Sequence, residues 1–80
     1  MSIFEELKEI IFETCLVDKD AITEEASFTE DLGIDSLDAV EISWILEEKY
    51  NIVIPDEDFE KIKTVGDAVR YLESLIENPE

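Results

Sequence analysis

Apolar residues recur at every third or fourth position through three stretches of this sequence, the spacing of an α-helix that buries one face. No stretch alternates between apolar and polar residues over the length of a strand. The best strand candidate, residues 52–54, is too short to stand alone. An 80-residue chain accommodates one domain. We therefore predict an all-α fold: a single domain over residues 1–80, built as a four-helix bundle with three main helices and one short helix.

Capping residues indicate where the outer two helices begin. Ser2 and Glu5 have the spacing of a capping box, which predicts a first helix from Ser2 to about Leu16. The last helix is predicted to begin at Thr64, with Asp67 three residues further on, and residues 78–80 are expected to fray. The buried stripes predicted for these two helices are Ile3, Leu7, Ile10, Ile11 and Leu16 in the first, and Val65, Ala68, Val69, Leu72, Leu75 and Ile76 in the last.

The middle of the chain contains the second helix and the short one. The second helix is predicted from residues 35–36 to residues 50–51, with Asp35 as a candidate N-cap. Pro55 prevents simple continuation of this helix. A short helix over residues 56–62 then precedes the last one.

A long connection, residues 17–35, joins the first two helices. A loop of this length in a small domain needs anchors, because an unanchored segment loses conformational entropy on folding without compensation. Gly33 offers a backbone position without a Cβ atom just before the second helix. The apolar residues expected to hold the connection against the helices are Val17, Ile22, Phe28, Leu32 and Ile34.

The second helix carries two apolar faces. At about 100° per residue, Ala39, Ile42, Leu46 and Tyr50 form a core face, while Leu37, Val40 and Trp44 lie opposite. A small bundle has difficulty burying both faces. The second stripe, with acids around it, is therefore interpreted as a partner-docking surface. The alternative is that the long connection folds over this stripe and buries it.

The charge of the chain is strongly one-sided. It has 23 acidic and 6 basic residues, a formal net charge of −17. Such a surface repels nucleic acid and anionic membranes and attracts proteins with Lys/Arg patches. From residue 30 to residue 60 the only base is Lys49. We expect no nucleic-acid or membrane partner, and docking to partners that present basic patches.

Several kinds of chemistry lack the necessary residues. The chain has no histidine, which excludes Ser-His and Cys-His nucleophile pairs and removes the commonest nitrogen ligand of zinc. Its single cysteine, Cys15, forms no internal disulfide and fits a reducing compartment. Two glycines cannot build a Gly-rich phosphate loop. No segment reads as a signal peptide or a membrane span. We predict a cytoplasmic protein that is not an enzyme and holds no metal.

Ser36 lies in the segment DLGIDSLDAVEI, residues 31–42, at the expected start of the second helix. This segment resembles the phosphopantetheine attachment motif of acyl carrier proteins, centred on DSL. Residues 54–72, IPDEDFEKIKTVGDAVRYL, resemble the downstream half of the same family. The resemblance covers essentially the whole chain. A hydroxyl in the first turn of a helix also suits a phosphodiester, because the helix dipole and free N–H groups favour negative charge there.

The resemblance implies a carrier. A phosphopantetheinyl transferase would move a 4′-phosphopantetheine arm from coenzyme A to Ser36, and acyl groups would ride on its thiol as thioesters. Partners would be fatty acid synthase-type or related acyl-processing enzymes with basic docking patches, met by a monomer. The docking residues would be Asp35, Leu37, Asp38, Val40, Glu41, Trp44, Glu47 and Glu48. The acyl pocket would be lined by Phe28, Leu46, Ile54, Ile62 and Ala68.

Other functions stay open at this point. The cargo could be aminoacyl or peptidyl, or the chain could be an unmodified acidic interaction or cation-binding protein. Trp44 stands where relatives in fatty-acid synthesis commonly carry a smaller, flexible residue such as Met. The pathway is therefore either fatty acid biosynthesis or a related specialised lipid or polyketide branch.

Overall fold

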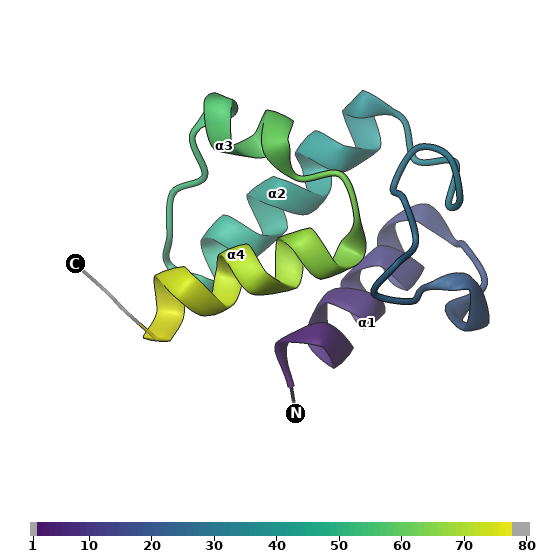
Figure 1. Cartoon of the computed structure of the whole chain (residues 1–80), viewed down its shortest axis with the longest axis horizontal. Helices are drawn as coiled ribbons and strands as arrows, with labels where there is room; N and C mark the ends of the chain where they lie inside the picture. Colours follow the sequence, from purple (N-terminus) through teal and green to yellow (C-terminus); the bar gives the residue numbers. More distant parts are fainter. Residues whose placement is uncertain (1, 78–80) are drawn as a thin grey trace.

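Four α-helices make up most of the part of the chain that the structure describes, residues 2–77. In the computed structural model, α1 spans Ile3–Cys15, α2 spans Ser36–Tyr50, α3 spans Asp56–Lys61 and α4 spans Val65–Glu77 (Figure 1). A one-turn 3₁₀-helix, η1 at Lys19–Ala21, lies in the long connection. Within residues 2–77 there is no strand, only an isolated bridge. The predicted all-α class, with three main helices and one short helix, is confirmed; the fraying expected of residues 78–80 lies outside the described residues.

Two helices begin at the side-chain caps predicted from the sequence. The Ser2 hydroxyl accepts a hydrogen bond from the Glu5 backbone N–H at 3.2 Å and starts α1. At the start of α4, Thr64 and Asp67 cap each other with two reciprocal hydrogen bonds. Thr64 Oγ1 accepts from the Asp67 N–H at 3.1 Å, and Asp67 Oδ2 accepts from the Thr64 N–H at 3.2 Å. These bonds satisfy N–H groups that a helix leaves free in its first turn, which is why the boundaries follow local sequence.

The core lies where α1 packs against α2 and α4. Leu7 and Ile11 of α1 are fully buried, and Ile42 and Leu46 of α2 pack into the same cluster, so the predicted core face of α2 is confirmed. Ala39 and Tyr50 border the cluster and are half-buried. The remaining buried members are Ile22, Ala26, Leu32, Ile34, Val65, Ala68, Val69 and Leu72.

The connection between α1 and α2 is fastened to the start of α4. Ile22, Leu32 and Ile34 are buried as predicted, whereas Val17 and Phe28 are half-buried. Backbone hydrogen bonds add to this burial: Phe28 N to Lys63 O at 3.1 Å, Val65 N to Ala26 O at 3.0 Å and Gly66 N to Glu24 O at 2.8 Å. The contact at Gly66 is so close that a Cβ atom there would lie 2.9 Å from the Glu24 carbonyl oxygen. The long loop is therefore held in a fixed position across the bundle. We call this connection, residues 17–35, the strap.

Two residues predicted to be buried are exposed. Leu16 is 80% exposed because it lies beyond the last turn of α1, at a C-cap position in the left-handed conformation. Ile76 is 37% exposed because the last turn of α4 extends beyond α1 (Figure 1). Helical spacing places a residue on a face, but it does not say where the neighbouring helix ends.

Replacing Leu16 by glycine should stabilise the protein. Leu16 has φ 58°, a conformation that a side chain with a Cβ atom adopts only at an energetic cost. We expect Leu16→Gly to raise the free energy of unfolding by about 0.5–1 kcal/mol, measured by urea denaturation. Asn51→Gly is the control, because Asn51 has φ 57° but asparagine tolerates this conformation well. Equal effects at both sites would contradict the prediction.

Candidate functional site

The segment before α2 fixes the position of Ser36. Gly33 has φ +67°, the left-handed conformation that glycine adopts freely, as its place in the sequence suggested. The next residue, Ile34, is 2% exposed, and its N–H donates to the Phe28 carbonyl at 2.8 Å. Ser36, two residues later, is the first residue of α2 and is exposed. A buried anchor thus holds an accessible serine at the helix start.

The first turn of α2 is arranged around an acidic cap. Asp35 Oδ1 accepts a hydrogen bond from the Asp38 N–H at 2.9 Å, which confirms Asp35 as the N-cap. Among the described residues, no side chain or backbone group bonds to the Ser36 hydroxyl. The N–H groups of a helix's first turn and the positive end of its dipole favour an anion at this position. The site therefore fits a phosphodiester attached to Ser36.

Cys15, at the end of α1, lies close to the start of α2. Its thiol is partly buried, and the burial raises its pKa; the charges of Asp38, Glu41 and Asp35 raise it further. A raised pKa disfavours the thiolate, which is the nucleophilic form of cysteine. Cys15 therefore packs against the core as a small, partly buried residue whose thiolate form is disfavoured.

The outer face of α2 is open to solvent. Leu37 is 79% exposed and Trp44 is 64% exposed, while Val40 between them is half-buried. The alternative in which the long connection covers this stripe is therefore wrong: the connection is bonded to the start of α4 instead. Glu41 and Glu48 are exposed on the same helix. An apolar strip with carboxylates around it is thus present on the surface.

Glu47 has a different place from the other predicted docking acids. Its carboxylate accepts a hydrogen bond from the Ile54 backbone N–H at 2.8 Å, and the residue is half-buried. This bond ties the connection after α2 back onto the helix. One oxygen of Glu47 is therefore committed inside the domain, and Glu47 contributes less free charge to the outer face than the sequence suggested.

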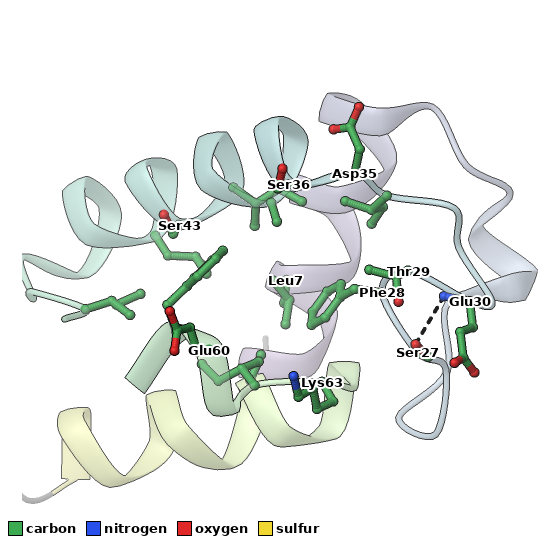
Figure 2. Close-up of a pocket in the computed structure, with 18 residues that line it drawn as sticks. Leu7, Ser27, Phe28, Thr29, Glu30, Asp35, Ser36, Ser43, Glu60 and Lys63 are labelled. Atoms are coloured by element: carbon green, nitrogen blue, oxygen red, sulfur yellow. Dashed lines mark hydrogen bonds between the residues drawn. The ribbon is translucent and has the colours of Figure 1, made fainter. Parts of the chain in front are cut away.

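A cleft of about 850 Å³ lies between α2, α3 and the strap, with Ser36 at one end of its lining. Figure 2 shows Ser36 at the start of α2, Leu7 and Phe28 near the centre of the view, and Glu60 on α3. Apolar side chains dominate the interior. All five residues predicted for the acyl pocket line this one cleft: Phe28, Leu46, Ile54, Ile62 and Ala68.

Further lining residues were not assigned to the pocket from the sequence. Ala39 and Ile42 share the α2 face of Leu46, so helical spacing alone could have added them. Leu7 comes from α1, and only the packing of helices brings it here. Ser43 also lines the cleft, and its hydroxyl donates to the Val40 carbonyl at 2.6 Å. Its only proton is engaged within α2.

A phenol–carboxylate hydrogen bond fastens α3, which forms one wall of the cleft. Tyr71 of α4 donates to Asp58 Oδ2 at 2.8 Å. Burial raises the pKa of Tyr71 to about 12, with the hydrogen bond to Asp58 and the charges of Asp58 and Glu47 adding to the effect. A second bond of this kind joins Tyr50 of α2 to Glu6 of α1, and burial again raises the pKa of the phenol.

Residues 2–77 contain neither a group of side chains placed to hold a metal ion nor a membrane-spanning helix. In this range no group of three or more Cys, Asp and Glu side chains is placed to hold a metal ion. Over the same residues, none of the helices combines the length and the apolar character needed to cross a bilayer.

Comparison with known proteins identifies the class. Residues 5–72 match the family described as the phosphopantetheine attachment site. The acyl carrier protein of Wolinella succinogenes is 55% identical over 74 residues, covering 92% of this chain and 97% of that protein. The acyl carrier protein of Helicobacter pylori is 53% identical over 73 residues, covering 91% and 94%. That of Sulfurovum sp. is 47% identical over 75 residues, covering 94% and 100%.

The chain is thus a phosphopantetheine-binding carrier domain, the class that its helical fold and exposed serine had indicated. Within that class it belongs to the acyl carrier protein family. It carries acyl groups on covalently attached 4′-phosphopantetheine, and it is a carrier and not a catalyst. It interacts with a phosphopantetheinyl transferase and with acyl-processing enzymes.

Tyr71 should make stability fall at alkaline pH. The pKa of its phenol is about 12 in the folded protein, against about 10 in an unfolded chain. Between these values the unfolded chain loses a proton that the folded protein keeps, so the free energy of unfolding falls as pH rises. Urea unfolding across this window measures the slope. Tyr71→Phe should show a smaller fall, and equal slopes for both proteins would refute the linkage.

Proposed function

We propose that Ser36 is the attachment point for the 4′-phosphopantetheine arm of a single carrier domain over residues 1–80. One observation carries the proposal: an exposed hydroxyl that forms no hydrogen bond with any group of residues 2–77 stands at the start of α2, beside an apolar cleft. The first-turn N–H groups would favour the phosphodiester. The arm supplies a terminal thiol on which an acyl group is held as a thioester.

The cleft supports an acyl cargo over an aminoacyl one. Its apolar lining side chains, such as Phe28, Leu46 and Ile54, offer no hydrogen bonds to an ammonium group. The carboxylates of the lining belong to exposed residues, Glu30, Asp35 and Glu60. Burying an unpaired charge among them would be costly, whereas burying methylene groups is favourable by about 0.8 kcal/mol each. The five predicted pocket residues would shelter the acyl chain until the thioester reacts at the next enzyme.

The outer face of α2 would receive partner enzymes. Leu37, Val40 and Trp44 supply apolar contact area, and Trp44 is a large anchor of the kind that dominates interfaces. Basic patches on partners would meet the surrounding carboxylates, which speed encounter more than they strengthen the final complex. The carboxylates proposed for this role are Asp35, Asp38, Glu41 and Glu48, with a smaller part for Glu47.

The setting of the protein follows from its charge and cysteine use. We place it in the cytoplasm as a monomer, because its net charge of −17 opposes self-association and its one cysteine fits a reducing compartment. Fatty acid biosynthesis is the pathway proposed. The bulky indole of Trp44 on the docking face leaves a specialised lipid or polyketide branch as the other setting.

Loading of the arm tests the attachment site directly. Incubation with coenzyme A and a broad-specificity phosphopantetheinyl transferase should add one phosphopantetheinyl group, seen in the intact mass. Ser36→Ala should abolish the gain because it removes the accepting oxygen. Ser43→Ala is the matched control on the same helix and should load normally, since its hydroxyl is engaged with Val40.

Two outcomes of the loading test would reject the assignment. A wild-type protein that gains no mass would favour an unmodified acidic interaction protein. A Ser36→Ala protein that is still loaded would place the arm elsewhere. A panel of acyl and aminoacyl donors, offered to the loaded protein with matching ligases, then separates the two carrier functions.

Charge reversal on α2 tests the docking face. Glu41→Lys with Glu48→Lys should slow loading by the transferase, with kcat/KM lower by about tenfold or more at low ionic strength, because steering toward basic patches is lost. Glu13→Lys with Glu73→Lys is the control: both residues are exposed, and the net charge changes equally. Raising the salt concentration should reduce the difference between the two variants.

The docking proposal fails if both charge-reversed proteins are loaded at the same rate. Such a result would mean that overall charge, and not the α2 face, guides the encounter. Trp44 fluorescence gives an independent reading, since an exposed indole should be quenched by iodide in the free protein and protected in the complex.

A further inference from the structure

We infer that Tyr71 is a specificity-determining residue, because its hydrogen bond to Asp58 holds the α3 wall and thereby sets the length of acyl chain that the cleft accommodates. The inference rests on the proposed sheltering of the acyl chain and adds a structural limit to it. Neither Tyr71 nor Asp58 lines the cleft.

The α3 helix is weakly embedded. It has six residues, Asp56–Lys61, and none of them, although the structure describes all six, is fully buried. Its N-cap position is Pro55, which makes no side-chain cap bond. Apolar burial, which fixes α1, α2 and α4, therefore contributes less to the position of α3. Phe59 is only half-buried, and Ile62 packs against the core from the C-cap position of the helix. Polar contacts therefore contribute more to the position of α3 than to the positions of α1, α2 and α4.

One such contact joins the body of α3 to another helix. Among the described residues, the bond from Tyr71 to Asp58 is the only side-chain hydrogen bond between α3 and another element. Both ends of the segment are fixed separately. Ile54 N donates to Glu47 before α3, and the Lys63 carbonyl accepts from Phe28 N after it. Loss of the Tyr71 bond would therefore free the middle of a segment whose ends stay anchored.

The bond acts on the cleft through adjacent residues of α3. Asp58 points to α4, while the next two residues, Phe59 and Glu60, line the cleft. Consecutive helical residues are rigidly related at about 100°, so a displacement of Asp58 carries Phe59 with it. With the bond in place, α3 closes the cleft at its present width. Without it, α3 can move outward and admit a longer chain.

The chain contains a matched control. Tyr50 donates to Glu6, so Tyr50→Phe also deletes one phenol–carboxylate bond between helices. That bond joins α2 to α1, and neither partner lines the cleft. Both variants should therefore lose stability, but only Tyr71→Phe should change the behaviour of α3. Asp58→Asn is a conservative variant, because the amide oxygen still accepts from the Tyr71 hydroxyl.

The experiment uses the loaded protein carrying a series of saturated acyl chains of increasing length. Thioester hydrolysis at mild alkaline pH is measured for each chain, since a sheltered chain holds its thioester away from water. We expect the wild-type protein to protect best at one chain length. Tyr71→Phe should move this optimum to longer chains, while Tyr50→Phe and Asp58→Asn should keep the wild-type optimum.

Amide hydrogen exchange in the arm-free protein gives a second readout. Tyr71→Phe should accelerate exchange in α3 about tenfold, the effect of losing one charge-assisted hydrogen bond. Tyr50→Phe should leave the ratio between the exchange rate of α3 and those of the other helices unchanged. If the wild-type optimum exists but all four proteins share it, the inference about Tyr71 is overturned while sheltering stands. If the wild-type hydrolysis rate does not depend on chain length, the proposed sheltering fails and the inference with it.

Discussion

The fixed course of the strap between α1 and α2 is the constraint on which the site depends. Backbone bonds from the strap to residues 63–66 hold it against the start of α4, and Ile22, Leu32 and Ile34 are buried beneath it. Because Ile34 is locked into the core, the turn at Gly33 can deliver Ser36 to the surface at a defined point. A free loop of the same length would leave the proposed attachment serine without a fixed relation to the cleft.

Because of this constraint, the two faces of α2 have different roles. The inner face supplies Ile42 and Leu46 to the core and cleft, and the outer face leaves Leu37 and Trp44 in solvent. The helix start between them presents a hydroxyl and favours a phosphodiester through its dipole. None of these features requires a tuned acid or base, which agrees with membership in a family of carriers. The reactive thiol comes from the arm, whereas burial and neighbouring carboxylates raise the pKa of Cys15 and disfavour its thiolate.

The walls of the cleft differ in how firmly they are held. Two of them, α2 and the strap, are fixed by buried apolar residues, whereas α3 is short and has no fully buried residue among its described positions. Under the proposed sheltering of the acyl chain, this difference would let the cargo enter and leave while the rest of the domain stays folded. The Asp58–Tyr71 bond then becomes important for the width of the cleft, since a single polar contact matters most where apolar packing is weakest.

The sequence by itself determined the helix boundaries, the core face of α2 and the acidic serine-bearing motif. Caps such as Ser2–Glu5 and Thr64–Asp67 join residues three apart, and such short-range contacts are readable from spacing. The five pocket residues were also predicted, through resemblance to a family. Tertiary structure alone decided the exposure of Leu16 and Ile76, the engagement of Glu47 and the bonds of Tyr50 and Tyr71. These depend on where each helix ends and how it lies against its neighbours, because groups distant in sequence meet only after the helices have packed.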